Sequence, residues 1–175
     1  KILIFSSFSR TNADNIIQHF KCNNIGEVVS VFTNNPKAYV IERAKKFQIP
    51  TVIFSKEELI DSKVLQKINT FQPDLIVLAG FLLKFPKNIV ESYPNEIINI
   101  HPALLPKYGG KGMYGMNVHK AIVENKEKET GITIHYVNEN YDEGNIIFKK
   151  KVTLLVTDTP EVVAEKIHEL AQKYF

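Results

Sequence analysis

Asn99 and His101 combine side-chain types that could act together on one substrate. They flank Ile100 in an apolar run that predicts a β-strand, and because side chains alternate along a strand, both point to the same side. Pro102 has no N–H group to donate to a neighbouring strand, so it ends the run and places His101 at the carboxyl edge of the predicted sheet. The sequence thus predicts an amide donor and an imidazole that are presented together.

A second polar pair and a carboxylate follow later in the chain. Thr133 and His135 share one face of another predicted strand, and polar side chains on a buried face need partners. Asp142 lies in the bend that comes next, in the sequence Asp-Glu-Gly. Glycine permits backbone angles that other residues avoid, so we expect Gly144 to let this bend aim Asp142 at the sheet edge.

Asn99, His101 and Asp142 together suit acyl-group transfer through a tetrahedral intermediate. A carboxylate beside an imidazole raises the pKa of the imidazole and keeps it protonated, while a neighbouring amide can donate to a developing oxyanion. Each residue also has a structural alternative, because a histidine at a strand end is often only a hydrogen-bonded structural residue and Asp-Glu-Gly is a common turn. A zinc site is the weaker interpretation, since the five His residues and Cys22 show no paired ligand spacing, and we predict no metal.

Strands and helices alternate in the part of the chain that precedes these residues. Five short apolar runs lack polar alternation, as expected for strands buried on both faces of a parallel sheet: residues 2–5, 28–32, 51–54, 75–79 and 97–100. Helical periodicity lies between them over residues 14–20, from Pro36 onward with Val40, Ile41 and Ala44 inward, and over residues 56–68. The pattern predicts a doubly wound α/β fold, a mostly parallel twisted sheet with helices on both faces, whose ligands bind at the carboxyl ends of the strands.

The second half of the chain changes character. A Gly-rich stretch at residues 108–115 and a short helix around His119 precede two longer strands, at 131–137 and 145–153, which we predict to form a hairpin. The sequence 158–161, Asp-Thr-Pro-Glu, is typical of a helix start, and apolar residues follow at helical spacing. No repeat, linker or low-complexity segment interrupts the chain, so we predict one domain over residues 1–175.

Composition narrows the class of protein. The 175 residues carry 22 Lys and Arg against 19 Asp and Glu, a net charge of +3, and 44% are hydrophobic. The small and evenly spread charge argues against broad nucleic-acid binding. The single cysteine, Cys22, excludes an internal disulfide framework, and the apolar start of the chain is too short for a signal peptide or a membrane span. We therefore expect a cytoplasmic protein that binds neither nucleic acid nor membrane.

Four motifs between residues 79 and 144 carry a family resemblance that covers essentially the whole chain. They are Ala79-Gly80-Phe81-Leu82, Asn99-Ile100-His101-Pro102-Ala103-Leu104-Leu105-Pro106-Lys107-Tyr108, Gly131-Ile132-Thr133-Ile134-His135 and Tyr141-Asp142-Glu143-Gly144. Together they resemble the phosphoribosylglycinamide formyltransferases, the folate-dependent transformylases of purine synthesis. Within the folate enzymes, a second His directly after the first would indicate a formyltetrahydrofolate hydrolase, and Arg-Gly-Ala after Leu-Leu-Pro would indicate the methionyl-tRNA enzyme, and this chain has neither.

The resemblance implies a reaction and a role for each site residue. The amine of glycinamide ribonucleotide attacks the formyl carbon of 10-formyltetrahydrofolate, a co-substrate. By similarity His101 is the proton donor and oxyanion stabiliser, Asn99 orients the formyl oxygen and contacts the folate, Asp142 keeps His101 protonated, and His135 supports them. Residues implied to bind the folate are Lys56, Leu82, Leu83, Lys84 and Phe85, and those implied to bind the ribonucleotide phosphate are Arg10, Thr11 and Asn12. The nucleotide-binding half would span about residues 1–80 and the folate and catalytic half about 81–175.

Three residues depart from the family pattern. Phe8 and Arg10 stand in the phosphate loop where relatives have glycine, and Ala171 stands in the last helix where relatives place a Glu. A working transformylase with weakened nucleotide affinity is the favoured interpretation. The alternatives are a folate-binding relative that has lost transfer, or another folate-dependent formyltransferase or hydrolase. We expect a monomer or weak homodimer, and we expect the last few residues of the family's domain to lie beyond Phe175.

Overall fold

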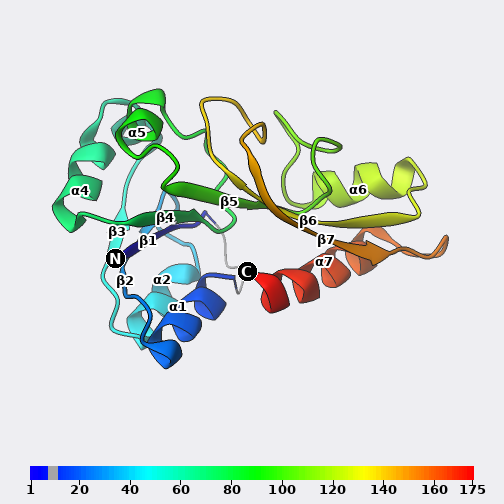
Figure 1. The fold of residues 1–175 in the computed structure, drawn as a ribbon, viewed down its shortest axis with the longest axis horizontal. Helices are drawn as coiled ribbons and strands as arrows, with labels where there is room; N and C mark the ends of the chain where they lie inside the picture. Colours follow the sequence, from blue (N-terminus) through cyan, green and yellow to red (C-terminus); the bar gives the residue numbers. More distant parts are fainter. Residues whose placement is uncertain (8–11) are drawn as a thin grey trace. The chain divides into compact units, whose positions relative to one another are not determined.

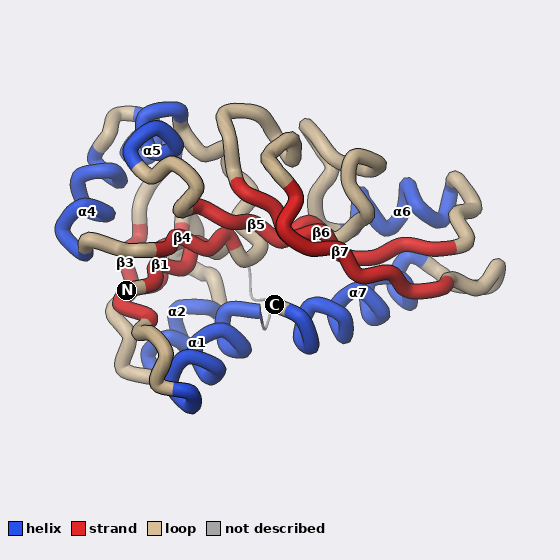
Figure 2. The backbone as a smooth tube through the Cα atoms, viewed as in Figure 1, coloured by secondary structure: helices blue, strands red, loops and turns tan. Residues whose placement is uncertain are grey.

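The chain folds into two compact units, Lys1–Ile98 and Asn99–Phe175, in a computed structural model that describes residues 1–7 and 12–175. Figure 1 follows the chain through its helices and strands, and Figure 2 colours the same trace by secondary structure. Strand β5 (Ile97–His101) runs across the boundary between the units. The units are described separately below.

The first unit is a parallel sheet with helices around it. Its strands are β1 (Ile2–Phe5), β2 (Val28–Thr33), β3 (Thr51–Ile53) and β4 (Leu75–Leu78), in the order β3-β2-β1-β4. Its helices are α1 (Asn12–Asn23), α2 (Val40–Lys46), α3 (Lys56–Ile60), α4 (Lys63–Phe71) and α5 (Lys87–Ser92). Helices α1 and α2 lie on one face of this sheet and α4 and α5 on the other (Figure 1). The predicted strands are therefore confirmed to within one residue, as is the presence of helices on both faces.

Two helical predictions for this unit were wrong, and one helix was not predicted. Helix α2 begins at Val40 and not at Pro36, because the side-chain oxygen of Asn35 accepts the N–H of Lys37 at 3.0 Å and closes a turn there. The predicted helix over residues 56–68 is two helices, since Ser62 adopts a left-handed φ of 71° between α3 and α4. Helix α5 was not predicted, and its six residues are too few to show a clear period.

The second unit is built around an antiparallel hairpin. Strands β6 (Glu129–Tyr136) and β7 (Ile146–Thr153) pair in the register Thr133 to Lys149, with an irregularity between Ile134 and His135. Helices α6 (Met116–Glu124) and α7 (Pro160–Tyr174) pack on this hairpin through one apolar cluster, which includes Val118, Ile122, Ile132, Ile134, Val163, Ile167 and Ala171. The predicted hairpin is confirmed, and so is the predicted start of the last helix, where the hydroxyl of Thr159 accepts the N–H of Val162.

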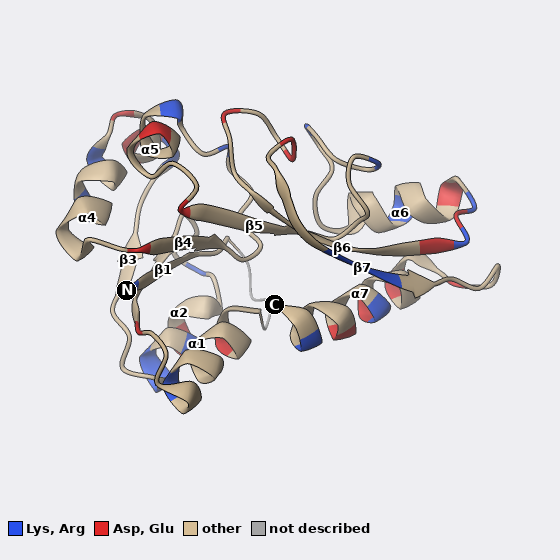
Figure 3. Ribbon diagram, in the orientation of Figure 1, with Lys and Arg blue, Asp and Glu red and all other residues tan. Residues whose placement is uncertain are grey.

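Strand β7 is an edge strand, and nearly all of its residues are exposed. Figure 3 shows the basic run on this strand, which consists of Lys149, Lys150 and Lys151. Lysines on an edge strand oppose pairing with the edge of another sheet, because the approaching charges repel. In the part of the chain that the structure describes, no helix is long and apolar enough to span a membrane.

Candidate active site

The amide of Asn99 is oriented by His135. Asn99 lies near the end of β5 and His135 on β6, and the Nδ2 atom of Asn99 lies 3.1 Å from the Nε2 atom of His135. The other ring nitrogen of His135, Nδ1, lies 2.8 Å from the carbonyl oxygen of Tyr136. A carbonyl only accepts, so Nδ1 carries the proton and Nε2 of the neutral ring accepts from Asn99. One of the two N–H groups of Asn99 is used in this way, which leaves the other to meet a substrate.

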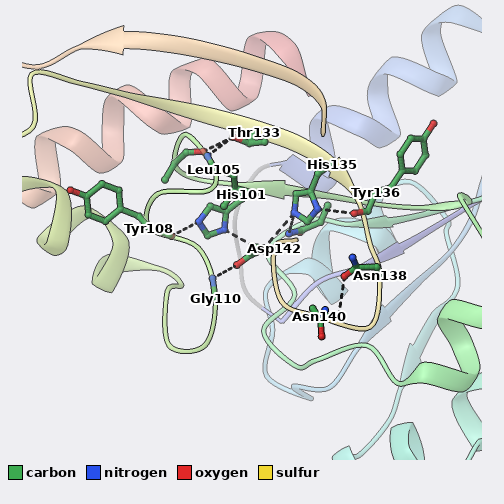
Figure 4. Close-up of polar contacts among 12 residues, drawn as sticks. His101, Leu105, Tyr108, Gly110, Thr133, His135, Tyr136, Asn138, Asn140 and Asp142 are labelled. Carbon is green, nitrogen blue, oxygen red and sulfur yellow. Dashed lines mark hydrogen bonds and ion pairs between the residues drawn. The ribbon is translucent and has the colours of Figure 1, made fainter. Parts of the chain in front are cut away.

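His101 is the last residue of β5, and its ring lies between a carbonyl and a carboxylate (Figure 4). Its Nε2 atom lies 2.6 Å from the carbonyl oxygen of Tyr108, and its Nδ1 atom lies 3.5 Å from Oδ1 of Asp142. Because the carbonyl accepts, Nε2 carries the proton and Nδ1 of the neutral ring presents a lone pair toward Asp142. Nδ1 is therefore the atom of His101 that can gain a proton.

Asp142 approaches both imidazoles from the bend between β6 and β7. Its Oδ1 atom lies 3.5 Å from His101 and 3.6 Å from Nε2 of His135, and its Oδ2 atom accepts the N–H of Gly110 at 3.0 Å. The residue has a left-handed φ of 56°, a conformation that Asp tolerates better than most residues. The site therefore includes a backbone donor from the Gly-rich stretch that fixes the carboxylate.

The expected role of Gly144 in this bend was wrong. Among the described residues with positive φ, Asp142 occurs and Gly144 does not. Gly144 is required for a different reason, because a Cβ atom there would lie 1.6 Å from the carbonyl oxygen of Tyr136. The bend closes tightly across the hairpin, and Asp142 itself takes the unusual backbone angle.

Burial decides the protonation of His101. The side chain is only 4% exposed, and this burial lowers the pKa of His101 below its ordinary value of 6.5. The charge of Asp142 and the carbonyl of Tyr108 act in the opposite direction but do not outweigh it. Asp142 therefore acts on the pKa of His101 in the predicted direction, but burial has the larger effect.

Asp142 is ionised in this arrangement. Burial of the carboxyl is the largest influence and opposes ionisation, but the neighbouring imidazoles of His135 and His101 and the N–H of Gly110 together lower the pKa of Asp142. A neutral imidazole facing a buried carboxylate can accept a proton, because the imidazolium that forms is then stabilised by the negative charge beside it. Within residues 1–7 and 12–175, no cluster of three His, Cys, Asp or Glu side chains is arranged to hold a metal ion.

Comparisons with known proteins decide the family. A family model described as formyl transferase matches residues 1–175, the whole of this chain. The chain belongs to the formyl transferase family. It is 32% identical to phosphoribosylglycinamide formyltransferase of Escherichia coli (strain K12), over 95% of this chain and 79% of that protein. The resemblance predicted from the motifs is confirmed.

Other formyl transferases extend the match. The chloroplastic phosphoribosylglycinamide formyltransferase of Arabidopsis thaliana is 36% identical over 99% of this chain. The crystal structure of the Bacillus halodurans enzyme matches 99% of this chain and 90% of its own, with 33% identity and a TM-score of 0.90. This chain spans 62% and 55% of the length of the two plant relatives, those of Arabidopsis thaliana and Vigna unguiculata. The α/β formyltransferase fold is thereby confirmed.

In this formyl transferase, the residues predicted to bind folate do not share one environment. Leu82 lies just after β4 and donates its backbone N–H to the hydroxyl of Ser7 at 3.1 Å, while Leu83 is half-buried. Phe85 is 3% exposed, and its ring lies 4.9 Å from that of Phe5, so it packs in the aromatic core of the first unit. The side chains of two further predicted residues are exposed, and these are Lys56 and Lys84.

One of the residues predicted to bind phosphate, Asn12, lies within the described part of the chain. Arg10 and Thr11, together with Phe8, lie outside the described residues. Asn12 is the first residue of α1 and is buried. Ala171, the third departure from the family pattern, is 5% exposed and packs in the apolar cluster of the second unit.

Three contacts of the site were not predicted from the sequence. The carbonyl of Tyr108 and the N–H of Gly110 are backbone groups, and backbone groups have no residue-specific signal. Thr133, a polar residue that the sequence predicts to need partners, holds the loop that follows β5. Its hydroxyl accepts the N–H of Leu105 at 3.0 Å and donates to the carbonyl of Ala103 at 2.7 Å.

Proposed function

We propose that this formyl transferase moves the formyl group of 10-formyltetrahydrofolate to the amine of glycinamide ribonucleotide, a step of purine biosynthesis. The observation that carries the proposal is the joint placement of Asn99, His101 and Asp142 in a chain that the formyl transferase family matches from end to end. Relatives named phosphoribosylglycinamide formyltransferase are 30% to 36% identical to this chain.

The reaction needs an oxyanion donor and a carrier for one proton. The amine nitrogen forms a bond to the formyl carbon, and the carbonyl electron pair moves onto oxygen. The second N–H of Asn99, held in place by His135, stabilises that oxyanion. Collapse of the intermediate breaks the bond between the formyl carbon and the folate nitrogen, which leaves with the electron pair.

His101 carries the proton between the two nitrogens. In the free protein it is neutral, so Nδ1 takes the proton that the attacking amine loses. Asp142, 3.5 Å away, stabilises the imidazolium while it exists. The same atom then gives the proton to the departing folate nitrogen. His101 thus serves as base first and acid second, which includes the proton-donor role that the family resemblance implies.

The test is incubation of the purified protein with 10-formyltetrahydrofolate in the presence and in the absence of glycinamide ribonucleotide. Mass spectrometry would follow the formylated ribonucleotide, and absorbance would follow the folate. We expect formylated product only when both substrates are present. Formate released without the ribonucleotide would indicate a hydrolase, and folate binding without turnover would indicate a relative that has lost transfer, and either result would overturn the proposal.

A further inference from the structure

Tyr108 holds His101 through its backbone carbonyl while its own side chain is held elsewhere. The carbonyl oxygen lies 2.6 Å from Nε2 of His101, and the hydroxyl at the other end of the residue donates to Oε1 of Glu127 at 2.8 Å. The same carboxylate oxygen accepts from Nζ of Lys107 at 3.0 Å. Glu127 therefore fixes two consecutive residues of the loop that delivers the carbonyl to the imidazole.

The conformation of Tyr108 requires such support. Its φ is 57°, in the left-handed region, which costs a residue with a Cβ atom roughly 1 kcal/mol or more. The ring packs against the apolar cluster of the second unit, and the hydroxyl reaches Glu127, whose own N–H donates to the carbonyl of Ile122 at the end of α6. Packing of the ring and the bond to Glu127 together hold the unusual backbone angle that turns the carbonyl toward His101.

Near neutral pH the Tyr108 hydroxyl is protonated and the Glu127 carboxylate is ionised. Burial, together with the neighbouring Glu127, raises the pKa of Tyr108 to about 12, so the hydroxyl remains a donor. The hydrogen bonds from Lys107 and Tyr108 lower the pKa of Glu127, so the acceptor remains ionised. A hydrogen bond to a charged acceptor is stronger than one between neutral groups.

We propose that Glu127 is a positioning residue for His101: by holding the hydroxyl of Tyr108 it fixes the carbonyl that selects the Nε2–H form of the imidazole. Without that acceptor the neutral ring can place its proton on Nδ1 and donate it to Asp142, and Nδ1 could then no longer accept a proton from a substrate. The catalytic consequence rests on the proposed function, whereas the selection of the ring form does not.

The experiment measures the ring form and the activity of the same proteins. Nitrogen NMR of labelled protein distinguishes Nε2–H from Nδ1–H, with the His101 signals assigned by their loss in His101→Gln. The variants are Tyr108→Phe, which removes only the hydroxyl, Glu127→Ala, and Glu127→Gln, whose amide oxygen can still accept. The matched control is Glu129→Ala, because Glu129 also binds a lysine, Lys151 at 2.6 Å, but lies apart from Tyr108 in the hydrogen-bond network.

We expect Tyr108→Phe and Glu127→Ala to shift the His101 ring toward Nδ1–H and to lower kcat roughly tenfold, with the KM for the folate changed by less than about twofold. Glu127→Gln should restore most of the loss, and Glu129→Ala should behave as the unmodified protein. Unchanged ring signals in both Tyr108→Phe and Glu127→Ala would overturn the proposal, whatever the activity. A shifted ring with unchanged kcat would overturn its catalytic part. Absence of transfer in the unmodified protein would count against the proposed function alone, since the ring signals would still be read.

Discussion

Thr133 provides a sensitive test of how the loop after β5 is held. Its side chain is fully buried, and its one hydroxyl makes two hydrogen bonds, accepting from the N–H of Leu105 and donating to the carbonyl of Ala103. Valine has nearly the same shape but no hydroxyl, so Thr133→Val leaves two buried backbone groups without that partner. Each such group costs about 1 to 3 kcal/mol, and we expect a total loss of about 2 to 6 kcal/mol in the free energy of unfolding.

Urea unfolding followed by circular dichroism would measure this loss, with Thr133→Ser as the matched control. Serine keeps the hydroxyl and loses one methyl group, which costs about 1 kcal/mol. The valine variant should therefore be the less stable of the two, and its unfolding temperature should fall by roughly 10 °C. A valine variant as stable as the unmodified protein, or more stable than the serine variant, would refute the assignment of the two hydrogen bonds as the support of this loop.

Three further predictions concern protonation and the bend. Because Asp142 raises the pKa of His101, Asp142→Asn should move the acidic limb of the kcat/KM profile to lower pH while reducing its plateau, and a limb that moves to higher pH would contradict the account. Because the pKa of His101 is lowered on folding, the unfolded chain binds more protons just below the ordinary value of 6.5, so stability should fall as pH falls through that region. Thermal unfolding between pH 5 and pH 7 should show this dependence weakened in His101→Gln, and an equal dependence in both proteins would count against it. Gly144→Ala should distort the bend, since its Cβ would meet the carbonyl of Tyr136, and a loss of less than about 1 kcal/mol in urea unfolding would show that the hairpin yields easily.

The strands could be predicted closely because their residues carry a strong and local signal. Val28–Thr33 and Leu75–Leu78 consist mostly of β-branched, aliphatic and aromatic residues, as is typical of a buried parallel strand. Helix ends were harder, because apolar periodicity continues through Ser62, where a left-handed backbone angle separates α3 from α4. That angle depends on local packing and has no counterpart in the periodicity of the sequence.

The site was predictable where side chains alone define it. Alternation along β5 placed Asn99 beside His101, and the turn sequence placed Asp142 near them. The backbone partners could not be predicted, because the carbonyl of Tyr108 has no residue-specific signal. The effect of burial on the pKa of His101 could not be predicted for a related reason, since the depth of burial depends on the whole fold.

The central claim is that His101 carries the proton during formyl transfer. Single-turnover transfer by His101→Ala, measured beside the affinity for the folate, tests it most directly. We predict that the rate of transfer falls about 100-fold or more, because general acid and base catalysis contributes about 10² to 10⁴, while the Kd for the folate changes by less than about twofold. A transfer rate within about tenfold of the unmodified protein, or a loss that weaker folate binding fully explains, would contradict the account.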